Sequence, residues 1–471
     1  MAQMVQLAPA KMPLVAFEHY MLADERKSHS MACHMRFWFT GHFVQSDFEG
    51  ALRRVLIRHP VFQMTVEGPT TNKTNEIYWV AKSSVVRACL ATSNPESSSA
   101  EQAVVMPFIS WGELGTPIDT PLTGATMDLH TEIGIRFWIR QSNSESTPKT
   151  VLLIQFHHSA CDGLGIIQFM DDLLMTYGQL RGSCQLTCPM IDPTAFNLRG
   201  THHLDQEKWA ARTSLDWRRT LKYFMTIPTP MLGGRPPRPP KCEVSDALAS
   251  ERIVLPKNYL DRYRENARLK NVSVNDLLIR DLFLSLADWN RSQRKTCRIV
   301  RLALAVSLRV VGDSCASAAN NVSMVFLDRS ARKIRRSDLL QSISNETKEI
   351  MSFRMGLSLI RVLKRLGSLR YLMAFVVRLP VCSSTAVLTN VGHVFSNSKL
   401  MGTNGKVSLG DISLESLELL APVRPKTNAA FSINYYAGEL SITMRFNSLV
   451  MTTENANQFL NQFSSRIKDC S

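Results

Sequence analysis

The chain has 471 residues, of which 45% are apolar and 20% charged, and its formal net charge is +15. A chain of this length is too long for one ordinary core and suits two domains of roughly 200 residues each. It has no uncharged apolar run of roughly 18 or more residues, which argues against a membrane-spanning helix. Residues 1–13 lack the basic start and apolar stretch of a secretory signal, so we expect a cytoplasmic protein.

The first half alternates predicted strands and helices. Residues 35–40 and 62–66 are expected to be strands around a helix that begins at Ser46, with Glu49 completing a capping box, and ends at Pro60. Apolar residues alternate over 133–139, which predicts a strand with one buried face. The continuous apolar run 151–156 predicts a central strand covered on both faces. After Gly163 the apolar spacing becomes helical.

A Pro/Gly-rich segment, residues 226–240, divides the chain, because it suits neither a helix interior nor a central strand. We therefore predict an N-terminal subdomain over 1–225, a linker over 226–244 and a C-terminal subdomain over 245–471. Beyond the linker we expect helices at 275–289, capped by Ser273, and from Ser337 to Met351, and a strand at 299–308. A hairpin at 431–446 and a helix at 454–467 complete the pattern.

Ten cysteines are scattered without the spacing of a disulfide framework, so we expect reduced and mostly buried thiols. Cys184 and Cys188 precede the adjacent His202 and His203, a spacing that fits the two knuckles of a zinc site poorly. We expect no bound metal.

Positive charge is concentrated in residues 205–241, with eight Lys/Arg against three acids, and 331–378, with eleven against three. Such clusters attract phosphates, acidic proteins or anionic membranes, or are simply solvated surface. The chain has no nucleic-acid-binding signature, so we do not expect nucleic acid as a partner. In residues 354–378 the cations alternate with apolar residues. One interpretation is a peripheral membrane surface that suits a lipid acceptor. The favoured one is an ordinary helix with its apolar stripe buried.

The segment His157–Gly163 (HHSACDG) lies in the predicted turn between the buried strand and the helix. A histidine titrates near neutral pH, so His158 is suited to take a proton from an attacking hydroxyl or amine and to return it to a leaving thiolate. A buried Asp162 paired with an arginine would hold the loop, and Gly163 would permit a tight turn. The helix N-terminus would ease negative charge on a tetrahedral intermediate. His157 points the opposite way along an extended segment and is expected to be structural.

At these residues the sequence resembles condensation domains of nonribosomal peptide synthetases. It also resembles their relatives: polyketide-associated acyltransferases, alcohol acyltransferases and wax ester synthases. Phe156–Gly163 matches their HHxxxDG signature, and weaker likenesses follow in order at residues 16–20, 58–62, 274–276, 306–309, 320–321 and 389–392.

The resemblance implies an α/β fold of two chloramphenicol-acetyltransferase-like subdomains arranged as a V, with a central tunnel. It implies that His158 is catalytic and Asp162 structural, with Arg309 as its expected partner, and that Asn390 and Gly392 lie near the substrate channel. No cofactor is bound permanently; the donor is acyl-CoA or an acyl-phosphopantetheine carrier protein. The acceptor is a small molecule or lipid, and the protein is a monomer.

The sequence also departs from the family pattern. Gln63 and Met64 stand where peptide synthetases carry an arginine, and no adenylation or carrier domain is recognisable. We therefore expect a stand-alone thioester-dependent O- or N-acyltransferase, of the kind used in secondary metabolism. Two alternatives stay open: a non-catalytic docking module that recruits a partner or carrier protein, and an epimerising relative.

Overall fold

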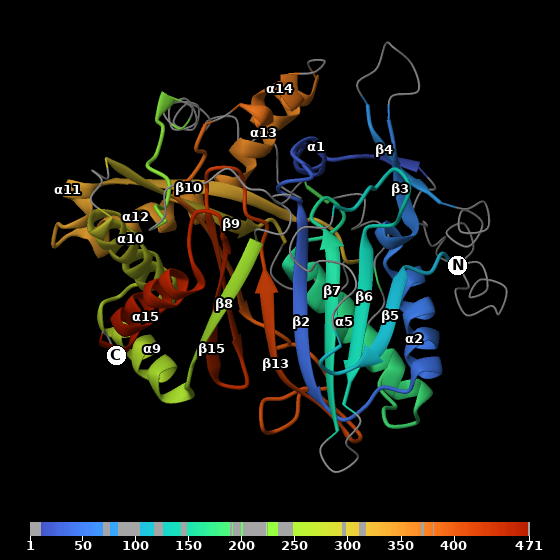
Figure 1. Cartoon of the computed structure of the whole chain (residues 1–471). Coiled ribbons are helices and arrows are strands. Elements are labelled where there is room, and N and C mark those ends of the chain that lie inside the picture. Colours follow the sequence, from blue (N-terminus) through green and yellow to red (C-terminus); the bar gives the residue numbers. More distant parts are fainter. Residues whose placement is uncertain are drawn as a thin grey trace.

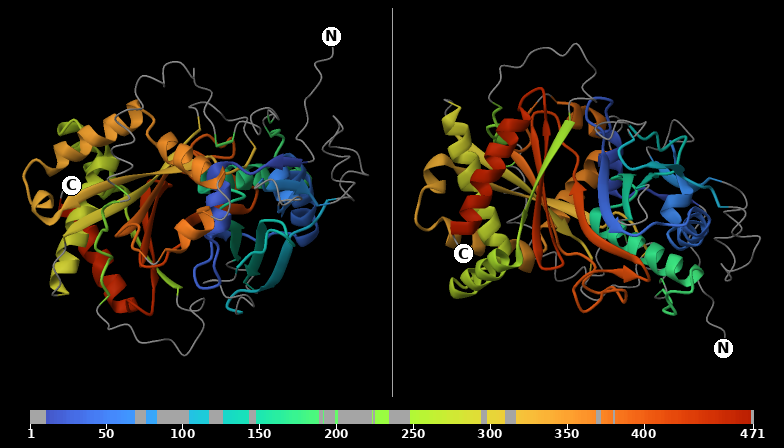
Figure 2. Two further views of the ribbon diagram at one scale, coloured as in Figure 1. Left: turned by 90° about the horizontal axis from the view of Figure 1, so that it is seen from above. Right: turned by 60° about the horizontal axis from the view of Figure 1, so that its bottom comes forward.

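A computed structural model describes residues 11–68, 76–82, 104–116, 126–142, 148–188, 191, 199–200, 223, 225–233, 248–293, 298–309, 317–368, 372–379 and 381–469. These residues form two halves that lie side by side, each built on a six-stranded sheet (Figure 1). Helices α2 and α5 accompany the N-terminal half, whereas α9, α10 and α15 gather at the outer side of the C-terminal half (Figures 1 and 2). The expected mixed α/β fold of two subdomains is confirmed.

The sheet of the N-terminal half has the strand order β12-β13-β2-β7-β6-β5, and only the β5–β6 pair is parallel. The bounds are β2 Ala32–Thr40, β5 Phe108–Glu113, β6 Ile135–Gln141, β7 Lys149–His157, β12 Ser408–Leu409 and β13 Ile412–Leu420. β12 and β13 come from the second half of the chain, so this sheet is completed by residues far beyond the expected linker. β7 lies between β2 and β6 and is buried on both faces over most of its length, as predicted.

The sheet of the C-terminal half has the order β10-β9-β11-β14-β15-β8, with β11 parallel to both of its neighbours. Its strands are β8 Leu248–Leu255, β9 Ile299–Ser307, β10 Val322–Ser330, β11 Ala386–His393, β14 Ala429–Tyr436 and β15 Glu439–Asn447. β14 and β15 form the predicted hairpin. A third, small sheet joins β1 Lys11–Pro13, β4 Tyr78–Ala81 and β3 Met64–Glu67.

The helices close over these sheets through two large apolar cores, one in each half. Their bounds are α1 Ala16–Ala23, α2 Gln45–Arg58, η1 Pro60–Gln63, α5 Gly163–Leu180, α9 Lys257–Leu269, α10 Val274–Ser292, α11 Ala331–Ile334, α12 Leu339–Ser352, α13 Gly356–Ser368, α14 Leu372–Arg378 and α15 Thr453–Asp469. Pro60 ends α2 as expected, since a proline cannot continue an α-helix, and instead begins the 3-10 turn.

Two of the predicted helix caps are wrong. α2 begins one residue before Ser46, after Val44, so the Ser46 hydroxyl is inside the first turn and cannot cap it. α12 begins after Asp338, and Ser337 therefore lies outside the capping position. Ser273 does cap α10, in a reciprocal capping box with Asp276.

The segment 226–233 forms neither helix nor strand, and the rest of the expected linker lies outside the described residues. The domain boundary stays a prediction. The five described cysteines are free thiols; Cys33, Cys161 and Cys382 are buried, and Cys184 and Cys188 are partly exposed. None of the described helices is long and apolar enough to cross a membrane.

Candidate active site at the β7–α5 turn

The motif HHSACDG occupies the turn between the central strand β7 and helix α5, the position expected from the change in apolar period. His157 is the last residue of β7, and Gly163 is the first residue of α5. Pairing with β2 on one side and β6 on the other holds the end of β7. The motif therefore stands on a rigid strand rather than on a free loop.

His157 is fully enclosed, and its contacts fix the turn. Its Nδ1 accepts a hydrogen bond of 3.0 Å from the Ser159 amide, so the ring proton belongs on Nε2. Nε2 lies 3.4 Å from a carboxylate oxygen of Glu25. The same Glu25 oxygen accepts the amide of Met31 at 2.5 Å. With both nitrogens directed at protein groups, His157 is placed to order the turn.

His158 is held through its backbone by both halves of the molecule. Its amide donates to the Met31 carbonyl at 2.9 Å, and its carbonyl accepts from Asn320 Nδ2 at 2.5 Å. The side chain is only partly buried. Its Nε2 has no hydrogen-bond partner among the described residues, which leaves that nitrogen available to a substrate.

The surroundings of His158 favour the neutral imidazole. Burial lowers the pKa of His158 from its ordinary 6.5, and the Asp162 carboxylate and the carbonyls of His158 and Cys161 oppose the shift only in part. Nδ1 is enclosed and makes no hydrogen bond of ordinary geometry with the described residues. At pH 7 the ring is therefore mainly unprotonated, the form that a general base requires.

The Asp162 carboxylate accepts hydrogen bonds from three residues, which lie in both halves of the molecule. One oxygen caps α5 by accepting the Gly165 amide at 2.8 Å. The other accepts Arg309 Nη1 and the Asn321 amide, both at 2.7 Å. Arg309 Nη2 also donates to the Ala319 carbonyl at 3.1 Å. The structure thus brings Asp162 and Arg309 together, and the pair ties the motif to the C-terminal half.

Gly163 does not have the role that we expected from its flexibility, since its backbone is outside the left-handed region. A Cβ atom there would lie 3.0 Å from Leu419 Cδ2 and 3.4 Å from Val391 Cγ1. There is little room for a side chain at this position because β13 and β11 pack against the start of α5. Gly165 is tighter still: a Cβ would meet Cys161 Sγ at 2.5 Å and the Ala319 carbonyl at 3.0 Å.

Asn390 and Gly392 line a separate cavity of about 220 Å³ in the C-terminal half, together with Asn275, Leu304, Ala305 and Leu388. Asn390 Nδ2 donates to Asn275 Oδ1 at 3.3 Å, and Asn390 Oδ1 accepts the Gly392 amide at 3.0 Å. Val391, between them, faces Gly163. The Asn390 amide is thus directed at Asn275, and the regular pairing of β11 with β14 is interrupted after Asn390.

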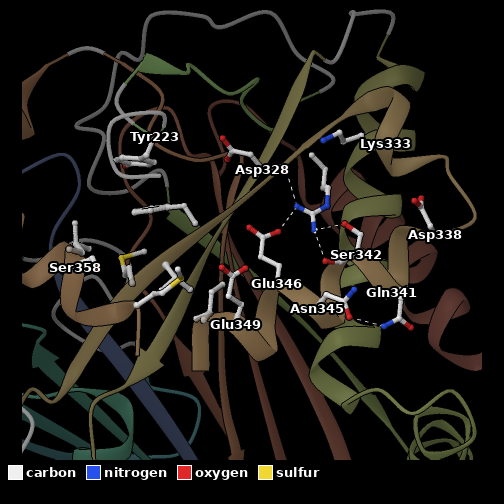
Figure 3. Close-up of a pocket in the computed structure, with 17 residues that line it drawn as sticks. Tyr223, Asp328, Lys333, Asp338, Gln341, Ser342, Asn345, Glu346, Glu349 and Ser358 are labelled. Atoms are coloured by element: carbon white, nitrogen blue, oxygen red, sulfur yellow. Dashed lines mark hydrogen bonds and ion pairs between the residues drawn. The ribbon is translucent and has the colours of Figure 1, made fainter. Parts of the chain in front are cut away.

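A cavity of about 620 Å³ lies between the edge strand β10 and helices α12 and α13 (Figure 3). Its polar side is already paired: Arg329 donates to Glu346 at 2.7 Å, and Asp328 accepts from Arg301. None of the residues His157–Gly163 lines it. The cavity is therefore distinct from the candidate active site.

Sequence reasoning missed three residues that hold the motif. Asn320 was quoted only as a family landmark, and Glu25 and Met31 were not singled out. Asn320 had a signal, its place in an Asn-Asn pair late in the chain, but Glu25 and Met31 act through contacts more than 100 residues away in sequence. Among the described residues there is no group of three or more His, Cys, Asp or Glu side chains that could hold a metal ion.

No protein-family model and no curated protein matches the sequence. Solved structures match over nearly the whole chain. Trichothecene 15-O-acetyltransferase from Fusarium sporotrichioides is 12% identical, with 100% of this chain and 98% of that chain covered and a TM-score of 0.68. The condensation domain of the monacolin K polyketide synthase is 14% identical, with 98% and 97% covered and a TM-score of 0.64.

The starter condensation domain of rhizomide synthetase is 13% identical, with 98% of this chain and 94% of that chain covered and a TM-score of 0.60. At such identities the likeness concerns the fold, and all three proteins share it over both halves of the molecule. The chain therefore has the fold of the condensation-domain-like acyltransferases.

Proposed function

We propose that the protein is an acyltransferase that moves an acyl group from a thioester to a hydroxyl or amine, with His158 as general base. The observation that carries the proposal is the setting of His158: its backbone is held by Met31 and Asn320, and its Nε2 has no hydrogen-bond partner among the described residues. Burial, which lowers the pKa of His158, favours the neutral ring that a base requires. His157 differs, because it is fully enclosed and its Nε2 faces the Glu25 carboxylate at 3.4 Å.

The reaction follows from this geometry. Nε2 of His158 takes the proton of the acceptor hydroxyl or amine while the acceptor attacks the thioester carbonyl, and a tetrahedral intermediate forms. The C–S bond then breaks, and the protonated imidazole returns its proton to the thiolate. The products are an ester or amide and a free thiol, and no covalent enzyme intermediate is needed. Asp162 and Arg309 keep the turn in place and exchange no proton.

The N-terminus of α5 should stabilise the oxyanion less than the sequence suggested. The Asp162 carboxylate sits at the N-terminus of α5 and already accepts a first-turn amide. A negative charge at that end offsets the positive end of the helix dipole. The helix is thus a poor source of stabilisation for the oxyanion, and the proposal does not rely on it.

The proposed donor is acyl-CoA or an acyl group on a carrier protein, and the acceptor is a small molecule or lipid from secondary metabolism. Two structural matches support this choice: one is named as an acetyltransferase, and one was solved in complex with C8-CoA and Leu-SNAC. We further propose that the substrates meet at His158 in a tunnel between the two halves and that the protein acts in the cytoplasm as a monomer.

The test is release of free thiol from a panel of acyl-CoA donors with mixed alcohols and amines. We expect His158→Ala to lower kcat/KM by about 10²- to 10⁴-fold, the usual loss for a general base. His42→Ala is the matched control, because His42 lies at the end of the β2–β7 pair that is opposite to the motif. It follows the end where Thr40 pairs with Lys149, whereas His157 pairs with Ala32 at the other end. Circular dichroism checks that both variants fold.

Equal turnover by wild type and His158→Ala would overturn the role of His158. If no free thioester is turned over, the same assay is repeated with acylated carrier proteins. A second failure would overturn the enzyme proposal and favour the docking module.

A further inference from the structure

Helices α13 and α14 form a protruding pair at one end of the molecule, next to α1 (Figure 1). The chain has no acidic residue between Glu349 and Asp411. Cations are frequent over the same stretch, and Arg354, Lys364, Arg365 and Arg378 are all exposed. No ion pair involves these four side chains among the described residues. These four side chains therefore make the helix pair a strongly positive surface.

The apolar stripe of α13 is covered by the protein itself. Leu363 is 5% exposed and packs with Phe17 and Met21 of α1, and Gly367 lies against His19. α13 is therefore an ordinary helix with its apolar stripe buried, which was the favoured interpretation of the sequence. The packing turns Arg361, Lys364 and Arg365 outward, since they lie on the opposite side of the helix.

α14 differs, because large apolar side chains on it and after it face solvent. Phe375 is 64% exposed, Leu379 40% and Val381 48%. The segment that carries Met225, which is 77% exposed, runs alongside: Arg301 Nη1 donates both to the Tyr223 carbonyl and to the Ser383 carbonyl. α14 and the residues after it thus present apolar side chains on the same helix pair as the cations of α13.

We propose that the α13–α14 surface docks on an anionic lipid membrane. Lysines and arginines are attracted to acidic headgroups, and protruding phenylalanine and leucine side chains insert at the boundary between headgroups and acyl chains. An acidic protein could pair with the cations, but such pairing does not account for the exposed apolar side chains of the same helix pair. A membrane accounts for both. This inference does not depend on the acyltransferase activity.

The experiment is flotation of the full-length protein with vesicles of phosphatidylcholine alone or mixed with phosphatidylserine. We expect binding only to the mixed vesicles and its loss in about 1 M NaCl, where the Debye length falls to about 3 Å. Lys364→Glu/Arg365→Glu should weaken the partition into mixed vesicles at low salt by about tenfold or more, and Phe375→Ser/Leu379→Ser should also weaken it at low salt although the net charge is unchanged.

The matched control is Leu269→Ser/Lys270→Glu on α9, where Leu269 is 74% exposed and Lys270 is its exposed neighbour. This variant should bind as wild type does. The proposal is overturned if the control loses binding as the α13–α14 variants do, or if mixed vesicles do not retain the wild type. It is also overturned if an acidic carrier protein, and not the vesicles, captures it through Lys364 and Arg365. None of the exposed residues changed here lies in the active site, so acyl transfer from a water-soluble donor should persist.

Discussion

Two adjacent histidines in this protein have opposite surroundings. His157 ends a strand and directs both ring nitrogens at protein groups, whereas His158 is fixed through its backbone and keeps Nε2 unbound. The difference follows from the alternation of side chains along an extended segment, which sends the two rings to opposite sides: the His157 ring is fully enclosed and the His158 ring is partly exposed. We therefore assign the proposed proton transfer to His158 and the ordering of the turn to His157.

The pH dependence of the reaction tests this assignment. Because burial lowers the pKa of His158 below 6.5, the active, unprotonated form predominates at and above neutral pH. We expect kcat/KM to be constant from about pH 7 upward and to fall on acidification, with a midpoint below 6.5. The profile is measured with a donor and an alcohol acceptor that do not titrate in this range. A midpoint above 6.5 would contradict the assignment.

At the scale of elements, the start of α5 is shaped by close packing. Gly165 leaves no room for a methyl group between Cys161 Sγ and the Ala319 carbonyl, and neither the short turn nor the backbone group can easily withdraw. We expect Gly165→Ala to lower the free energy of unfolding by about 1–3 kcal/mol, the usual cost of overpacking. It should also lower activity, because the turn that carries His158 must shift.

Gly50→Ala is the comparison for this prediction. Gly50 also lies in a helix, α2, and an added Cβ would meet only Leu180 Cδ1, at an ordinary 3.4 Å. Alanine is the better helix former, so this variant should be neutral or more stable by up to about 1 kcal/mol. Both are measured by urea denaturation. Equal effects of the two substitutions would contradict the packing argument.

The elements also show how far sequence reasoning reaches. Local sequence patterns predicted β7 from a continuous apolar run, α5 from helical apolar spacing, α10 with its Ser273 cap, and the final hairpin from its turn residues. They failed at the caps of α2 and α12, where a serine near a helix start is compatible with several first residues. The motif and the Asp162–Arg309 pair were expected from the family resemblance. Glu25, Met31 and the direction of Asn390 depend on tertiary contacts that no local pattern encodes.

At the scale of the whole molecule, the motif joins the two halves. Asp162 stands on the N-terminal half, and its partners Arg309 and Asn321 stand on the C-terminal half. The two side chains are 5% and 14% exposed, so removing one partner leaves a buried charge unpaired. We expect Asp162→Asn and Arg309→Met each to cost about 3–5 kcal/mol of stability.

A double-mutant cycle separates the pair from its surroundings. The coupling energy of Asp162 and Arg309 should be about 0.5–3 kcal/mol. The comparison pair is Arg181 with Asp47, which joins the other end of α5 to α2 at 3.3 Å and is far more exposed, so its coupling should be much smaller. If the effects of the Asp162 and Arg309 substitutions on the free energy of unfolding simply add, the ion pair does not hold the two halves together.

The N-terminal sheet is completed by β13, from the second half of the chain, and this has a consequence for how the protein is synthesised. β2, residues 32–40, is synthesised long before its neighbour in the sheet, residues 412–420, because residues 41–411 lie between them. Until then one edge of β2 has no partner and can pair with other chains. Asn320 and Arg309, which hold the motif, are also made late. The turn that carries His158 can thus reach its final contacts only after residues 309–321 have been synthesised, and a chain truncated before residue 412 exposes an edge of β2.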